Sequence, residues 1–380
     1  MSTRAAVRPK DGTAVRPAGP MVGSQASPTG SLDIGVVGAG RVGAVLGSAL
    51  AGAGHRVVAA SGNSSASIAR AARLLPGVRL VAPEGVGAAA DLLIVSVPDD
   101  DLADVVSRLV GAGGIRPGQV IVHTSGAHGL DVLAPAAAVG AQPLALHPAM
   151  TFTGHVDDLD RLAGGVSFGV TAPDELRPLA TRLVADLGGS VEWIAETQRP
   201  LYHAALAHGA NHLVTLVNEA MDRLRDSGVV HPERVLGPLL RASLENTLRY
   251  GDAALTGPVA RGDAGTIARH IAVLGAVAPD SVPAYVALAR RTADRAIASG
   301  RLRAVDAEPL LDALASVPGP ASSGLTSAGS EATGARREDE AARAAGPARA
   351  ERAPTDTVPG PASSTAPQPR RARRRASRAR

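Results

Sequence analysis

The chain has 380 residues, more than twice the roughly 150 that one domain typically holds, so two folded domains plus non-globular segments are expected. The composition is 45% hydrophobic but only 2% aromatic, so any core must be aliphatic. There is no cysteine, which excludes disulfide frameworks, thiolate metal sites and cysteine nucleophiles. Redox chemistry would therefore need a cofactor.

The formal charge of +4 comes from the two ends of the chain. Residues 1–30 hold 4 basic and 1 acidic side chains, residues 318–380 hold 12 and 6, and residues 31–317 hold 23 and 28. Both ends are rich in Pro, Ser, Ala and Gly and lack apolar periodicity, which predicts disordered tails. Arginines between Arg370 and Arg380 could bind nucleic acid nonspecifically, but a solubilising tail is the favoured interpretation.

The first part of the folded region predicts an α/β fold. Short β-rich runs alternate with helical patterns, which is typical of a Rossmann-type, doubly wound parallel sheet with helices on both faces. The predicted strands cover residues 32–37, 55–60, 91–97, 119–123 and 143–147, with 166–170 and 191–194 extending the same sheet. No stretch reaches about 18 apolar residues without proline or charge, so we expect a soluble, cytoplasmic protein with no membrane partner.

After residue 196 the strand signals stop and the pattern becomes helical. The predicted helices cover residues 200–226, 232–250, 263–274, 282–298 and 307–315. We therefore divide the chain into a disordered tail (1–30), a dinucleotide-binding Rossmann domain (31–195), a helical substrate and dimerisation domain (196–317) and a disordered basic tail (318–380).

A glycine pattern follows the first strand and opens a helix, which is the context that a dinucleotide site requires. Gly38 permits the tight turn, Gly40 lets the backbone approach a pyrophosphate, and Gly43 allows close packing of the helix. The helix N-terminus attracts the anion. The whole predicted turn is Gly38, Ala39, Gly40, Arg41, Val42 and Gly43.

The second strand ends without the carboxylate that usually holds the ribose 2′-hydroxyl of NAD. Ser61, Asn63 and Ser64 follow instead, and these donors, together with Arg70, suit the 2′-phosphate of NADP. NADP is therefore favoured over NAD, although a polar loop that accepts either cofactor is the alternative. Pro98 follows another strand, where the nicotinamide half would pass.

His147 is the best candidate for the chemistry, because histidine can move a hydroxyl proton near neutral pH and this residue follows an extended run. Ser125 follows the preceding strand and would lie at the same edge of the sheet. The two residues form a plausible pair, against the alternatives of a buried histidine bonded to backbone and a serine in a turn.

The helical domain offers a second cluster. Helical geometry places His203 and Asn211 two turns apart and His208 beside Asn211. Metal binding by these histidines is disfavoured because no carboxylate stands at the required spacing. Further along, Arg261 could clamp a carboxylate or phosphate, with Thr256 lining the same cleft.

At these residues the chain resembles a bacterial family of Rossmann-like proteins joined to a C-terminal helical domain of unknown function. The resemblance covers about residues 31–300. It rests on the glycine turn and on Val97-Pro98-Asp99, His123-Thr124-Ser125-Gly126-Ala127, Leu146-His147-Pro148, Tyr202-His203-Ala204-Ala205, Asn211, Leu255-Thr256-Gly257-Pro258 and Arg261-Gly262-Asp263.

This family is more distantly similar to prephenate dehydrogenases, ketopantoate reductases, pyrroline-carboxylate reductases and deazaflavin-dependent NADP reductases. The resemblance to the first implies a serine at Ser125 and a catalytic histidine at His147. In ketopantoate reductases a catalytic lysine precedes an asparagine by eight residues, and His203 stands at that position. The one lysine here is Lys10, in the N-terminal tail, which excludes a lysine acid.

The sequence therefore predicts an NADP-dependent oxidoreductase acting on a small, anionic metabolite in a cleft between the two domains. His147 would be the general acid or base, Ser125 would orient the substrate oxygen, and Arg261 with Asn211 would hold an anionic group. The resemblance implies a homodimer. The alternative from another class is a non-catalytic protein that senses NADP(H).

Overall fold

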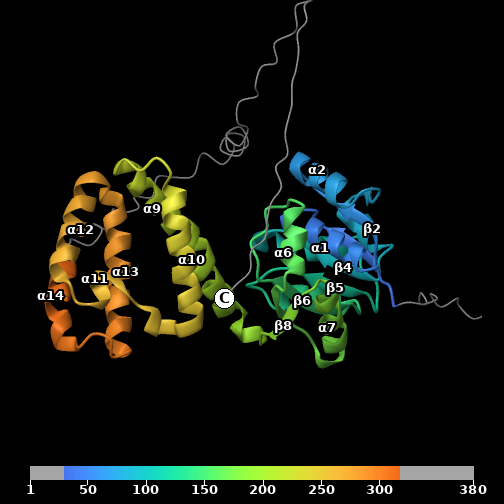
Figure 1. The fold of residues 1–380 in the computed structure, drawn as a ribbon. Coiled ribbons are helices and arrows are strands. Elements are labelled where there is room, and N and C mark those ends of the chain that lie inside the picture. Colours follow the sequence, from blue (N-terminus) through green and yellow to red (C-terminus); the bar gives the residue numbers. More distant parts are fainter. Residues whose placement is uncertain (1–29, 317–380) are drawn as a thin grey trace, which may run out of the picture. The chain divides into compact units, whose positions relative to one another are not determined.

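The structure, a computed structural model, describes residues 30–316, so both predicted tails, apart from Gly30, lie outside the described residues. An eight-stranded sheet has the order β3-β2-β1-β4-β5-β6-β7-β8 (Figure 1). Its strands are β1 (Asp33–Val37), β2 (Arg56–Ser61), β3 (Arg79–Leu80), β4 (Leu92–Val95), β5 (Val120–His123), β6 (Gln142–Pro148), β7 (Ser167–Thr171) and β8 (Ser190–Trp193). The predicted Rossmann-type sheet is thus confirmed, and β3 is a strand that the prediction did not include.

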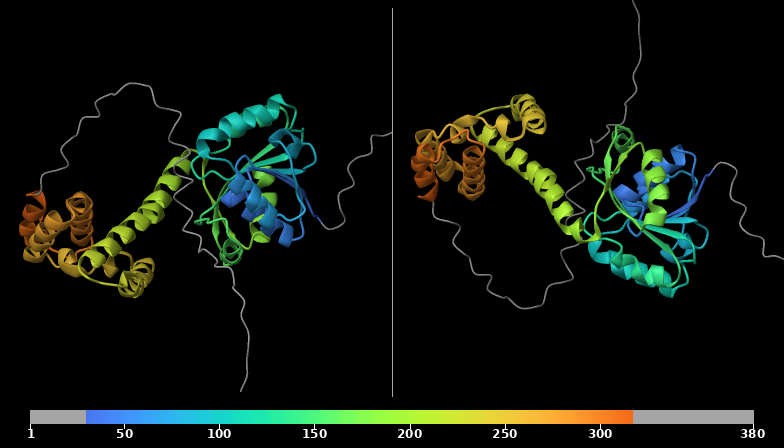
Figure 2. Two further views of the ribbon diagram at one scale, coloured as in Figure 1. Left: turned by 90° about the horizontal axis from the view of Figure 1, so that it is seen from above. Right: turned by 90° about the horizontal axis from the view of Figure 1, so that it is seen from below.

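Helices cover both faces of the sheet, as predicted. They are α1 (Arg41–Gly52), α2 (Ser65–Leu74), α3 (Pro83–Gly87), α4 (Asp99–Gly111), α5 (Ala134–Ala138), α6 (Asp157–Ala163) and α7 (Arg177–Asp186). One apolar core joins α1, α2, α6 and α7 to the sheet, and a second joins α3, α4 and α5 to the opposite face. Figure 2 shows the sheet between these layers, with α4 (teal) on one side and α1 (blue) on the other.

Alternating strand residues supply the two cores. In β4, Leu92 and Ile94 belong to the core with α1, whereas Leu93 and Val95 belong to the core with α4. Because side chains of a strand point alternately to opposite faces, this continuous apolar run fits a strand that is covered on both sides.

Two strands depart from the predicted parallel arrangement, because β7 and β8 run opposite to the other six. β7 pairs antiparallel with β6, with His147 opposite Gly169. The reason is the connection between them, residues 149–166, which leaves β6 at its carboxyl end and enters β7 at the same edge of the sheet. A parallel strand would have required a crossover back to the opposite edge.

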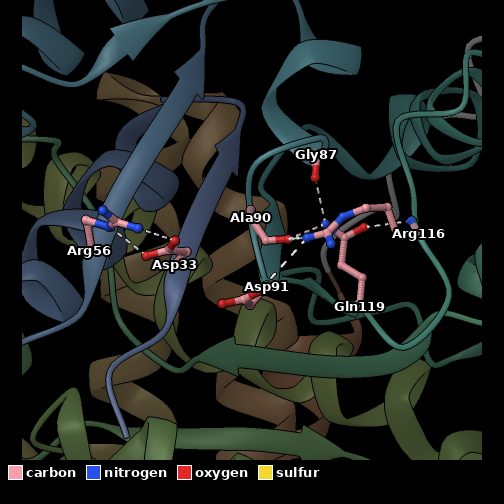
Figure 3. Close-up of polar contacts among 7 residues, drawn as sticks. All are labelled: Asp33, Arg56, Gly87, Ala90, Asp91, Arg116 and Gln119. Carbon is pink, nitrogen blue, oxygen red and sulfur yellow. Dashed lines mark hydrogen bonds and ion pairs between the residues drawn. The ribbon is translucent and has the colours of Figure 1, made fainter. Parts of the chain in front are cut away.

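A buried amide ties together the amino-terminal edge of the sheet (Figure 3). Gln119 is 3% exposed, and its Nε2 donates to the carbonyl oxygens of Gly87, at 2.9 Å, and Ala90, at 2.8 Å. Its Oε1 accepts the backbone N–H of Arg116 at 3.1 Å. One side chain therefore satisfies three backbone groups that have little access to water.

We expect Gln119→Leu to lower the free energy of unfolding by about 1–3 kcal/mol, because it keeps the side-chain volume but removes three buried hydrogen bonds and leaves the Arg116 N–H without its acceptor. Chemical denaturation measures the loss. Arg56→Gln is the control, since Arg56 forms an exposed ion pair with Asp33 and should change the unfolding midpoint little. Equal effects of the two substitutions would contradict this interpretation.

After β8 the described chain is helical, as predicted. The helices are α8 (Arg199–Leu206), α9 (His212–Asp226), α10 (Pro232–Tyr250), α11 (Gly257–Ala260), α12 (Ala264–Val277), α13 (Val282–Ala298) and α14 (Ala304–Ala315). The predicted single helix 200–226 is wrong in one respect, because a π-helical segment, Ala207–Asn211, separates α8 from α9. Within residues 30–316 no helix combines the length and the apolarity that crossing a bilayer demands.

Candidate functional site

Two glycines of the turn after β1 are required by packing. Gly38 has φ +89°, and a Cβ there would overlap the carbonyl oxygen of Ser96 at the end of β4. A Cβ on Gly43 would overlap the carbonyl oxygen of Gly38 and lie 3.0 Å from the Ser96 Cβ. Only glycine lets the turn, α1 and β4 approach this closely.

Gly40 is different, because nothing in the described protein fills the space that its side chain would take. A Cβ there would meet only the Gly38 carbonyl oxygen, at 4.0 Å, and its backbone is extended, with φ −72° and ψ −166°. Packing and backbone conformation therefore do not explain a glycine at this position. An approaching ligand does.

The first turn of α1 presents free backbone N–H groups beside Gly40. The first helical hydrogen bond to Gly40 comes from Ala44, at 3.2 Å, so the amides of Arg41, Val42 and Gly43 precede the helical ladder. No described side chain caps this N-terminus, and its first turn holds no acidic residue. Ala39 is not part of this group, since its N–H donates to the Ser61 carbonyl at 2.7 Å. Such an N-terminus binds phosphate well.

Two of the predicted 2′-phosphate donors near the end of β2 have structural roles. Ser61 is 3% exposed, and its Oγ accepts the Gly38 N–H at 3.2 Å. Ser64 caps α2 by accepting the Ser67 N–H at 3.1 Å. Asn63 is exposed. A role for these side chains in cofactor binding stays a prediction. Of the three, Asn63 is the one to which no structural role is assigned.

Pro98 lies at the N-cap of α4, directly after the β4 segment that contacts Gly38. The acidic residues Asp99, Asp100 and Asp101 occupy the first turn of α4, where negative charge stabilises a helix N-terminus. Pro98 thus stands at the same carboxyl edge of the sheet as the glycine turn.

His147 lies near the end of β6, at this edge. Its Nδ1 is 3.0 Å from the Tyr202 hydroxyl, and the two rings meet edge to face with centroids 5.6 Å apart. The ring of His203 lies 6.0 Å away. Burial, together with the positive charges of Arg199 and His203, lowers the pKa of His147 to about 4. The imidazole is therefore neutral at pH 7.

Ser125 takes the turn role that was the alternative to catalysis. It is 7% exposed, and its Oγ accepts the N–H groups of Ala127, at 3.2 Å, and His128, at 3.1 Å. The next residue, Gly126, faces the histidines, because a Cβ there would lie 2.7 Å from His203 Cδ2 and 3.1 Å from His147 Nε2. None of the hydrogen bonds described for Ser125 joins it to His147. Pairing of the two residues stays a prediction.

Arg199 links α8 to β5 and β7, and its role was not predicted from the sequence. It is fully buried, and its Nη2 donates to the Ser125 carbonyl at 2.6 Å, while Nη1 donates to Thr171 Oγ1 at 3.0 Å. Its Nε has no hydrogen-bond partner, and no described carboxylate lies within ion-pair distance. Arg199 thus fixes the start of α8 against β5 and β7, which places Tyr202 beside His147.

Tyr202 was also not assigned a role from the sequence. Gly169, opposite His147 in β7, leaves room for it, since a Cβ on Gly169 would lie 2.5 Å from the Tyr202 hydroxyl oxygen. Burial raises the pKa of Tyr202, so the hydroxyl keeps its proton at neutral pH. The sequence pointed to Tyr202 only through its position directly before the candidate residue His203.

The remaining predicted residues lie on the helices beyond α8. The π-helical turn changes the expected register: His208 contacts His212, with their Nδ1 atoms 3.2 Å apart, whereas Asn211 ends the π-helical segment. Proximity of His208 to Asn211 stays a prediction. Thr256 and Arg261 flank the short helix α11 at its two ends. No described hydrogen bond or ring contact joins these residues to His147, and their binding of substrate stays a prediction.

Comparison with known families agrees with this arrangement. Residues 19–148 match the profile of a Rossmann-like domain, and residues 166–292 match that of a domain of unknown function, DUF2520. The chain thus combines a region that matches the Rossmann-like domain with one that matches DUF2520. The family resemblance proposed from the motifs is thereby confirmed. No match was found among curated proteins.

Solved structures share the fold of this chain. A Bacteroides fragilis protein, provisionally described as an NADP oxidoreductase, is 23% identical with a TM-score of 0.60, covering 70% of this chain and 98% of its own. Thermotoga maritima protein TM1727 is 19% identical with a TM-score of 0.52, covering 70% and 99%. A Plasmodium falciparum pyrroline carboxylate reductase with NADP bound is 13% identical with a TM-score of 0.47, covering 73% and 98%.

Proposed function

We propose that this protein is an NADP-dependent oxidoreductase that acts on a small, anionic metabolite. The observation that carries the proposal is Gly40, whose missing side chain is explained by a ligand and not by packing. The amides of Arg41, Val42 and Gly43 would hold the pyrophosphate. NADP(H), when bound, supplies or accepts a hydride.

The topology supports a reacting centre near His147. Strands β1, β4, β5 and β6 run parallel, so the glycine turn, Pro98, Gly126 and His147 all belong to the carboxyl edge of the sheet. Ligands of doubly wound sheets bind outside this edge. A substrate held there would meet His147 and His203.

The protonation state of His147 favours a role as a general base. A neutral imidazole has one N–H and one lone pair, and Tyr202 occupies Nδ1 whichever tautomer is present. Nε2 is left on the side of Gly126, where a substrate oxygen could reach it. With a pKa of about 4, His147 is ready to accept a hydroxyl proton, or to hold a carbonyl oxygen when Nε2 carries the proton.

Two observations favour NADP over NAD. The segment from Ser61 to Ser65 contains no carboxylate that would repel a 2′-phosphate. The B. fragilis relative is also described provisionally as an NADP oxidoreductase.

The test of the proposed function is oxidation of NADPH by a panel of 2-oxo acids and imines that carry a carboxylate. Tight NADPH binding without turnover across that panel would instead favour a sensor.

We also propose that the active form is a homodimer, because α10 leaves an apolar ridge uncovered. Leu240, Leu244 and Leu248 recur every four residues, and the last two are 53% and 80% exposed. All residues from Arg241 to Tyr250 are exposed. A helix half without packing gains little stability in water, so we expect another surface to cover it.

A second copy is the occupant that fits this ridge. The helical region itself offers a groove of about 720 Å³ with an apolar lining that includes Leu216, Val273 and Leu288. Ridges spaced by four residues pack into such grooves between helices. One chain thus carries both complementary surfaces.

We expect the wild-type protein to be a dimer by light scattering at micromolar concentration, and Leu244→Glu with Leu248→Glu to shift it to monomer. A charge buried at a former apolar contact costs several kcal/mol, which explains the shift. Val305→Glu, an exposed apolar residue on α14, is the control and should remain dimeric. A monomeric wild-type protein at this concentration would refute the pairing.

A further inference from the structure

Three arginine side chains gather around one loop residue beside the glycine turn. Arg41 is the first residue of α1, and Arg70 and Arg73 lie on α2. Arg73 Nη2 donates to the carbonyl of Gly154 at 2.8 Å. A Cβ on Gly154 would lie 3.0 Å from Arg41 Cγ and would overlap Arg70 Nε. The loop after β6 thus brings all three side chains together.

These arginines lack counter-charges. None of the three forms an ion pair with a described carboxylate, whereas many other arginines of the chain do. Arg70 Nε is buried and has no hydrogen-bond partner among residues 30–316. Burial lowers the pKa of Arg70, and the charges of Arg41 and Arg73 lower it further. Three positive charges are therefore held close together without neutralisation.

Asp158, the acidic residue that contacts this loop, already has hydrogen-bond partners. Asp158 is fully buried, and its oxygens accept the N–H groups of Gly154, at 2.7 Å, and Thr153, at 2.8 Å. They also accept the Thr153 hydroxyl at 3.1 Å and Arg161 at 3.0 Å. Asp158 shapes the loop and does not neutralise the arginine cluster.

The cluster adjoins the place where an adenosine ribose would lie. α2 follows β2, the strand that pairs with β1, and α2 packs against α1, which begins at the glycine turn. The serines that could have held a 2′-phosphate are engaged, Ser61 with Gly38 and Ser64 with Ser67. The positive charge that remains near the second strand belongs to the arginines.

We propose that Arg41, Arg70 and Arg73 form a binding site for a phosphate monoester, and that its occupant is the 2′-phosphate of NADP. Guanidinium groups bind phosphate oxygens through paired, charge-assisted hydrogen bonds, and a dianion would relieve the repulsion among the three cations. This inference rests on the proposed function. It assigns cofactor selectivity to two helices instead of the loop after β2.

Fluorescence titration of the full chain with NADPH and NADH tests the site. Arg70→Gln and Arg73→Gln are each expected to weaken NADPH binding at least tenfold while NADH binding stays within about twofold. Arg70→Lys, which keeps the charge, should retain part of the preference. Arg108→Gln is the matched control, because Arg108 is exposed on α4, which covers the other face of the sheet. Thermal melting verifies that each variant is folded.

A second arm identifies the source of the phosphate. Adenosine 2′,5′-bisphosphate should compete with NADPH on the wild-type protein, while 5′-AMP and inorganic phosphate at the same concentration should compete far less. Equal competition by inorganic phosphate would overturn the assignment to the cofactor.

Failure of this inference differs from failure of the proposed function. If the wild-type protein binds neither dinucleotide, the proposed function fails and this inference fails with it. If the wild-type protein binds NADPH but the Gln variants lose NADPH and NADH equally, or lose neither, only the arginine site is refuted.

Discussion

His147→Asn is expected to lower kcat/KM for NADPH-dependent turnover by about 1000-fold while leaving NADPH affinity unchanged. Asparagine can still bond to the Tyr202 hydroxyl, so the local structure should survive. It cannot take up a proton at neutral pH, which removes the proposed transfer at Nε2. Initial rates from the absorbance of NADPH, together with a binding titration, separate the two effects.

Tyr202→Phe serves as the comparison, because it removes the partner of Nδ1 and leaves the imidazole in place. A smaller loss, of about 10- to 100-fold, is expected from a residue that only orients the histidine.

Since the pKa of His147 is about 4, kcat/KM of the wild type should be constant from pH 6 to 8 and fall as the pH drops through 4. Full activity of His147→Asn, or loss of NADPH binding with it, would contradict the assigned role.

Gly40→Val is expected to reduce NADPH affinity at least 100-fold without lowering the melting temperature. The extended backbone of Gly40 accepts any residue, and the protein leaves the position of the side chain open. The valine would therefore occupy only the space assigned to the pyrophosphate. Thermal melting and fluorescence titration of the same sample measure both quantities.

Gly43→Ala is the matched control within the same turn. Its Cβ would overlap the Gly38 carbonyl oxygen, so we expect a lower melting temperature or an insoluble protein. Comparing Gly40→Val with Gly43→Ala distinguishes a glycine that a ligand requires from a glycine that packing requires. Wild-type NADPH affinity in Gly40→Val would show that the open space is not the cofactor site.

Local patterns were enough to predict the sheet. β4 is a continuous apolar run and β1 is closed by Gly38, so the strands and the carboxyl edge of the sheet followed from the sequence, whereas the strand order was not predicted. The antiparallel β7 could not be predicted in this way. Its direction depends on where residues 149–166 re-enter the sheet, and neither periodicity nor composition carries that information.

The site was predicted less completely, for physical reasons. His147 was found because it ends a strand at the right edge, but Arg199 was not, since an arginine before a proline at a helix start usually lies in solvent. Its burial becomes visible only when β5, β7 and α8 meet. Likewise Ser61 and Ser64 have the right chemistry for phosphate, but tertiary and capping hydrogen bonds engage their hydroxyls first.

The claim on which the rest depends is that the turn from Gly38 to Gly43 binds a pyridine dinucleotide. Titration of the purified wild-type chain with NADPH, followed through nicotinamide fluorescence and through heat, tests it directly. We predict saturable binding of one dinucleotide per chain, tighter for NADPH than for NADH. No saturable signal with either dinucleotide, by both methods, would contradict the account.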